Sequence, residues 1–70
     1  MTRKLFRVTA LEAGNFYLIR FPDYPDLFTQ ATHIGEIEKM STDLINLMLE
    51  IPLEEIALKV EHISAAAITL

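Results

Sequence analysis

Two prolines, Pro22 and Pro25, constrain the fold of this chain more than any other feature. They lie between two apolar segments, in the run Phe21-Pro22-Asp23-Tyr24-Pro25-Asp26. Each proline fixes its own φ, lacks a backbone N–H and pushes the preceding residue toward an extended conformation. The run therefore predicts a stiff acidic turn that ends one β-strand, precedes the next and lies outside the hydrogen-bond ladder of a sheet.

The segments on both sides of this turn are typical of β-strands. Residues 3–11 alternate between two faces, residues 16–21 are aromatic and β-branched, and residues 27–32 follow the turn. Gly14 and Asn15, between the first two segments, tolerate the positive φ that a tight hairpin requires. We therefore predict a three-stranded antiparallel meander.

The hydrophobic period changes after residue 32. Apolar and small residues then recur at helical spacing: Ile34, Ile37, Ser41, Leu44, Ile45, Met48 and Ile51. Thr32 or His33 is the expected N-cap, and Glu36 can reach back to backbone N–H groups. Pro52 is expected to end this amphipathic helix near residue 50 or 51.

Residues 56–63 alternate again and predict a fourth strand. The predicted fold is α+β, an antiparallel β-β-β-α-β arrangement with one helix packed on one sheet face. Seventy residues form a single domain, 1–70, with its core in residues 3–63. The tail, residues 64–70, is small and apolar, and we expect its Ile68 and Leu70 to be buried, within the chain or against another subunit.

Composition limits the classes of ligand. The chain has ten acidic and six basic residues and a net charge of −4, which weighs against duplex nucleic acid and favours a basic protein partner. It has no Cys, and His33 and His62 are far apart, so we expect no disulfide, metal or other cofactor. A signal peptide and an apolar run of roughly 20 residues are both lacking, so we expect a cytoplasmic protein without membrane association.

A domain of this size buries only about 60% of its unfolded surface, so association with a partner or with other copies of the chain is expected. Apolar side chains lie on both faces of residues 16–21, and Met40 and Leu47 widen the apolar surface of the helix. We predict partner-binding residues that combine aromatic anchors with carboxylates: Tyr17, Ile19, Phe21, Asp23, Tyr24 and Asp26. Two alternatives stay open: the aspartates cap the turn, and neighbouring strands and loops cover the outer face.

The element order and the residues around the turn resemble HicB-type antitoxins of bacterial toxin–antitoxin pairs. The matching positions are Gly14, Tyr17, Phe21-Pro22-Asp23, Pro25, Phe28-Thr29-Gln30 and the helix from Ile34. This resemblance, over residues 3–63, implies a partial RNase H-like fold and a module that neutralises a basic, HicA-like, mRNA-cleaving toxin. Asp26 stands where the family has Gly, and Leu27 where a small residue is usual. Only seven residues follow Ile63, too few for the DNA-binding segment that the family usually carries.

We do not expect an enzyme. The sequence lacks a Gly-x-Ser-x-Gly nucleophile motif, and no acidic residue lies at the centre of a strand in the first hairpin, where a two-metal nuclease would need converging carboxylates. The alternative function is a stand-alone homo-oligomeric regulator that binds nucleic acid or a small ligand. Its basic patch would come from Arg3, Lys4, Arg7 and Arg20, which otherwise are solvated or pair with acids on adjacent strands.

Overall fold

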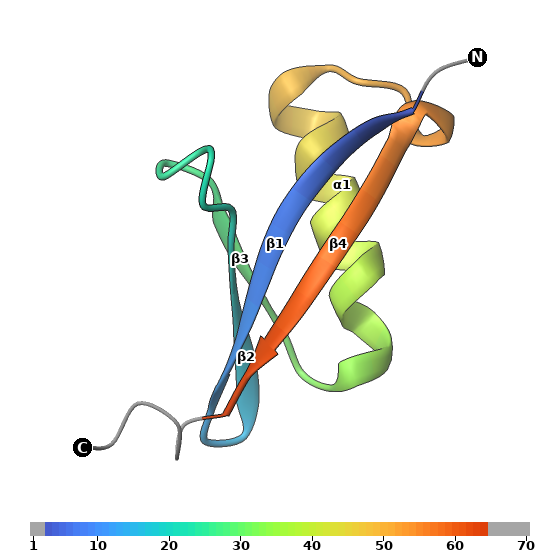
Figure 1. Ribbon diagram of the computed structural model, residues 1–70. Helices are drawn as coiled ribbons and strands as arrows, with labels where there is room; N and C mark the ends of the chain where they lie inside the picture. The colour runs from blue at the N-terminus through green and yellow to red at the C-terminus, as the bar shows by residue number, and fades with distance from the viewer. Residues whose placement is uncertain (1–2, 65–70) are drawn as a thin grey trace.

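The computed structural model describes residues 3–64 of the chain, in which one helix packs on one side of a single sheet (Figure 1). The strands and helices are β1 (Lys4–Ala13), β2 (Phe16–Arg20), β3 (Phe28–Ala31), η1 (Ile34–Glu36), α1 (Ile37–Leu49), η2 (Leu53–Glu55) and β4 (Ile56–Ile63). The predicted α+β class and the order β-β-β-α-β are confirmed, and the predicted strand boundaries are within two residues of the observed ones. The sequence predicts the helix from Ile34, but residues Ile34–Glu36 form the 3-10 helix η1, and α1 begins three residues later, at Ile37. The expectations for Ile68 and Leu70 lie outside the described residues.

The sheet is mixed, and the prediction of a purely antiparallel sheet is wrong. Its strand order is β3-β2-β1-β4. The meander is antiparallel as predicted, whereas β4 runs parallel to β1, with Lys4 opposite Ile56 and Leu11 opposite Ile63. The cause is α1, because a helical crossover returns the chain to the end of the sheet where β3 began, so the next strand runs in the same direction as β3 and β1.

The core lies between α1 and the face of the sheet that it covers. Its buried apolar residues are Phe6, Val8, Ala10, Ile19, Phe21, Leu27, Ala31, Ile37, Ile45 and Ile56. Ser41 is also fully buried, and its hydroxyl donates to the carbonyl of Ile37 at 2.7 Å. That bond satisfies the hydroxyl inside the core, where an unpaired polar group would be costly.

The helical segment is capped by a side chain at its start and ends at a residue with a left-handed backbone conformation. The backbone N–H and the hydroxyl of Thr32 both donate to Oε1 of Glu36, at 3.0 and 2.8 Å, which confirms that Glu36 reaches back across the first turn. His33 occupies the N-cap position of η1 but makes no capping side-chain bond. At the other end, Glu50 adopts the left-handed conformation, with φ of 57°, and α1 therefore stops before Pro52.

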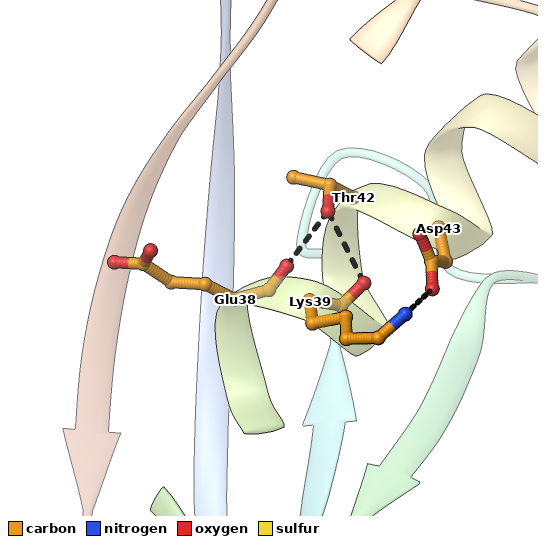
Figure 2. A network of polar contacts seen from close by, with 4 residues as sticks. All are labelled: Glu38, Lys39, Thr42 and Asp43. Atoms are coloured by element: carbon orange, nitrogen blue, oxygen red, sulfur yellow. Dashed lines mark hydrogen bonds and ion pairs between the residues drawn. The ribbon is translucent and has the colours of Figure 1, made fainter. Parts of the chain in front are cut away.

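The outer surface of α1 is polar along its first half. Figure 2 shows Lys39 paired with Asp43, Nζ to Oδ2 at 3.0 Å, beside the Thr42 hydroxyl, which donates to the carbonyls of Glu38 and Lys39. Toward its C-terminal end the exposed surface becomes apolar, since Leu47 and Met48 are 73% and 55% exposed. This change places an exposed apolar patch at the end of α1 that lies nearest the proline-rich turn (Figure 1).

Candidate functional site

The segment 21–27 between β2 and β3 is built from two consecutive β-turns. The N–H of Tyr24 donates to the carbonyl of Phe21, and the N–H of Leu27 donates to the carbonyl of Tyr24, both at 2.9 Å. Pro22 and Pro25 therefore each occupy the second position of a turn, where their fixed φ is already correct. Neither Asp23 nor Asp26 has a positive φ, which fits type I turns and explains how Asp26 is tolerated at a position where glycine would also fit.

This double turn is anchored to the core at two points. Leu27 is buried, and the ring of Tyr24 lies against that of Phe6, with 5.8 Å between the ring centroids. The rigid backbone and these anchors fix the backbone positions from which the two aspartate side chains project. The turn is therefore preorganised, and a ligand that binds it would not have to order it.

The two aspartates differ in their partners. Asp23 accepts two hydrogen bonds from Arg7, at 3.1 Å from Nε and 2.8 Å from Nη2. These bonds lower the pKa of Asp23 below its ordinary value and raise that of Arg7. Asp26 forms no ion pair with any residue of the described range 3–64. Of the two, Asp26 is the carboxylate available to an external cation.

A cleft of about 370 Å³ separates the double turn from the C-terminal end of α1. Its walls are apolar side chains and turn residues, with both aspartates at the rim: Asp23, Tyr24, Pro25, Asp26, Leu27, Met48 and Leu49. The cleft thus brings together three of the predicted partner-binding residues, Asp23, Tyr24 and Asp26. An apolar groove with a carboxylate at its edge suits a side chain that has an apolar stem and a cationic head.

The electrostatic surroundings of the cleft also favour a cation. The C-terminal end of α1 carries a partial negative charge from its unpaired carbonyls, and the last turn of the helix contains no basic residue. Residues 21–58, which include the double turn and α1, carry eight acidic side chains and one basic one, Lys39. Five of the six basic residues lie instead on or beside the strands β1, β2 and β4. Acidic side chains are therefore concentrated between the double turn and the start of β4, and basic side chains on β1, β2 and β4.

The other three predicted partner-binding residues do not lie at this cleft. Ile19 and Phe21 are 0% and 1% exposed within the core, so they are not accessible to a partner and their assignment is corrected. Tyr17 is half-buried near the opposite end of the sheet, where it lines a groove with Ile34 and His62. Because α1 covers the face that carries Tyr17 and Ile19, the residues of β2 that face outward are Phe16, Leu18 and Arg20.

The uncovered face of the sheet is apolar toward the β1–β2 hairpin and charged toward its other end. Leu18, Leu11 and Ile63 form a row across β2, β1 and β4, with Phe16 beside it. Arg7, Arg20, Lys59 and Glu61 occupy the same face farther along the strands. Arg7 and Arg20 are not direct cross-strand partners, since Arg20 lies opposite Thr9.

Sequence reasoning missed the contribution of α1 to the cleft. Helical spacing places Met48 on the apolar stripe with Ile37 and Ile45, yet its side chain is exposed and forms one wall of the cleft. The surplus of apolar residues around Leu47 was the available signal. It did not identify the loop that faces this end of the helix, because that pairing depends on the tertiary fold.

Within residues 3–64, no group of three or more His, Asp or Glu side chains is arranged to hold a metal ion. In the same range, no helix has the length and apolar character needed to cross a membrane.

Comparisons of the chain with protein-family models, with curated proteins and with solved structures gave no match.

Proposed function

We propose that this chain is a protein-binding module similar to a type II antitoxin, and that it neutralises a basic, HicA-like, mRNA-cleaving toxin. The observation that carries the proposal is the apolar cleft between the double turn and the C-terminal end of α1, in a segment, residues 21–58, with eight acidic side chains and one basic one. The proposal includes a cytoplasmic location, where mRNA is present. It assigns no catalytic residue, cofactor or metal to the chain.

The cleft would receive a Lys or Arg side chain of the toxin. The aliphatic stem would lie against Tyr24, Met48 and Leu49, and the charged head would reach the carboxylate of Asp26. The carbonyls at the end of α1 add a favourable field for the same cation. Asp23 would act indirectly, since its bond to Arg7 ties the turn to β1.

The fold is compatible with the resemblance. A meander, a crossover helix and a fourth strand beside β1 follow the element order that a partial RNase H-like domain of the HicB type implies. The departure at Asp26 does not disturb the double turn, because neither turn needs glycine at that position.

One observation favours a second candidate, a homo-oligomeric regulator that binds nucleic acid. Arg3, Lys4, Arg20 and Lys59 lie on the strand layer, and none of them forms an ion pair with another residue of the range 3–64. Such a surface could contact phosphates, and binding would then weaken steeply with salt. A salt-sensitive gel shift with RNA or DNA, in the absence of a protein partner, would favour this candidate over the first.

The direct test co-expresses the chain with the small basic protein encoded beside its gene. We expect the chain to restore growth that the basic protein arrests, and to co-purify with it. Asp26→Lys should weaken the complex at least about tenfold, because it replaces attraction of a cation by repulsion. Glu12→Lys is the matched control, since it makes the same charge change on β1, at the opposite end of the sheet.

Two outcomes contradict the proposal. The first is the lack of both a complex and growth rescue with the neighbouring basic protein. The second is a complex that Asp26→Lys and Glu12→Lys weaken equally, which would remove the cleft from the interface.

A further inference from the structure

Among residues 3–64, the outer edge of β4 is the longest unpaired strand edge. In the order β3-β2-β1-β4, no strand of the described range 3–64 pairs with that edge (Figure 1). β4 is eight residues long, contains no proline, and pairs with β1 through eight consecutive positions without a bulge. Natural sheets usually protect such an edge with a proline, a bulge, charged side chains or a covering segment, and of the first three devices β4 has only the charges of Lys59 and Glu61.

Helix α1 leaves the side chains along this edge partly uncovered. Grooves of about 300 and 280 Å³ separate α1 from β4, and both include Glu38. Leu58 and Val60, the apolar residues of β4 along these grooves, are half-buried. Figure 2 shows the side chain of Glu38 extended toward β4 and away from the Lys39–Asp43 pair. The edge therefore has exposed hydrogen-bonding groups on its backbone and unfilled apolar surface beside it.

Within residues 3–64, neither Lys59 nor Glu61 at the centre of β4 forms an ion pair, although Glu61 is close enough to Arg7 to help raise its pKa. Lys59 lies directly opposite Arg7 of β1, and like charges that face each other across two strands are unfavourable. Lys59 forms no ion pair with another residue of the described range. Its acidic neighbour on the same face of β4 is Glu61.

We propose that two copies of this chain pair through β4 as antiparallel strands, about a two-fold axis at Val60. In a two-fold symmetric pair, if one residue of the first copy faces a second residue of the other copy, the reverse contact also forms. Centring on Val60 places Lys59 of each copy opposite Glu61 of the other, which forms two cross-strand ion pairs. It also places Ala57 opposite Ile63, and joins the two sheets into one.

The charges on β4 favour the register centred on Val60 over the register centred on Lys59. Facing residues of an antiparallel pair share one face of the sheet, so a symmetric pair must centre on a residue that meets its own copy. Only centres at Lys59 and Val60 allow seven residues of β4 to pair. The first sets Lys59 against Lys59, whereas the second sets each Lys59 against a Glu61.

The residues of β4 on the face covered by α1 are also compatible with the register centred on Val60. Val60 would meet Val60 of the second copy, which covers apolar surface that α1 leaves half-exposed. Leu58 would meet His62 of the second copy, in the groove that Glu38 lines. The proposal does not depend on the toxin partner, because it uses neither the double turn nor the cleft.

The test measures the dissociation constant of the full chain by sedimentation equilibrium. We expect a dimer for the natural sequence, and a dissociation constant at least about tenfold higher for Lys59→Glu and for Glu61→Lys, because each change turns two attractions into two repulsions. Lys39→Glu is the matched control. It makes the same charge change on the outer surface of α1 and should leave the dissociation constant unchanged.

Combining the two charge variants tests whether weaker dimerisation is due to the proposed register or to a loss of folding. An equimolar mixture of the Lys59→Glu and Glu61→Lys chains should form a heterodimer with both ion pairs restored. The double variant Lys59→Glu/Glu61→Lys should return to within about threefold of the natural dissociation constant. A monomer at all concentrations overturns the proposal, and so does a dimer that neither single variant weakens or whose weakening the mixture does not reverse.

Discussion

At the scale of single residues, β2 shows why the covered face of a strand could not be deduced from its pattern. Residues 16–21 carry apolar side chains on both faces, so Phe16 and Leu18 match a core face as well as Ile19 and Phe21 do. The structure buries Ile19 and Phe21 because their face meets α1. This difference in burial has a direct consequence for stability.

Ile19→Ala should unfold most of the protein, whereas Leu18→Ala should not. Truncation of a fully buried isoleucine costs about 2–5 kcal/mol, which is comparable to the roughly 3–5 kcal/mol available to a domain of this size. Leu18 is only half-buried on the open face, and its truncation should cost about 1 kcal/mol. Urea denaturation followed by circular dichroism distinguishes the two variants. Equal losses of stability would mean that the face assignment of β2 is incorrect.

Glu36 should make the stability of the chain depend on acidic pH. Hydrogen bonds from the Thr32 backbone and side chain lower the pKa of Glu36 below its ordinary value. The ionised carboxylate therefore stabilises the fold above the pKa it has in the unfolded chain, and this contribution is lost as the pH falls through the lower folded-state pKa.

Comparison of the natural chain with Glu36→Gln measures that contribution. The difference in unfolding free energy should be present at neutral pH and should vanish in acid. Glu54→Gln is the control, since no hydrogen bond to the Glu54 side chain occurs in the described range. A difference for Glu36→Gln that persists unchanged at acidic pH would contradict the role of the ionised carboxylate.

At the scale of elements, hydrophobic period predicted which segments form strands and which forms the helix. Alternation over residues 56–63 specifies a strand but contains no information about its direction or its neighbour. The parallel pairing of β4 with β1 follows from the crossover through α1, and Lys4 and Ile56 meet although they are far apart in sequence. The cleft has the same origin, because Tyr24 and Met48 become neighbours only when α1 packs on the sheet.

The residue that ends α1, Glu50, has a strained backbone conformation that a substitution can relieve. Glu50 holds a left-handed conformation that disfavours residues with a Cβ atom and suits glycine. Glu50→Gly should therefore stabilise the chain by about 1 kcal/mol. Thermal unfolding measures the gain, and Glu54→Gly, outside the left-handed region, should lower the Tm instead. A lower Tm for Glu50→Gly would mean that the side chain of Glu50 stabilises the helix end in another way.

At the scale of the whole molecule, acidic and basic side chains are concentrated in different parts of the structure. The double turn and α1 form an acidic side with the cleft, while β1, β2 and β4 carry five of the six basic residues. The net charge of −4 predicted a preference for a basic partner but gave no position for it. In our two proposals, the basic partner binds the acidic side, and a second copy of the chain pairs with the edge of β4.

Pairing through β4 should make the thermal stability depend on protein concentration. A tenfold rise in concentration adds about 1.4 kcal/mol to the stability of a dimer, shared between two chains. Each kcal/mol shifts the Tm of a domain of this size by about 4–8 °C, so the Tm should rise by roughly 3–6 °C for each tenfold step. Scanning calorimetry of the natural chain and of Glu61→Lys measures the effect. The variant should unfold at a Tm that changes much less with concentration, because repulsion between Lys59 and the new lysine opposes pairing. A Tm for the natural chain that stays constant over a hundredfold range, about two such steps, would show that the fold does not draw stability from a second copy.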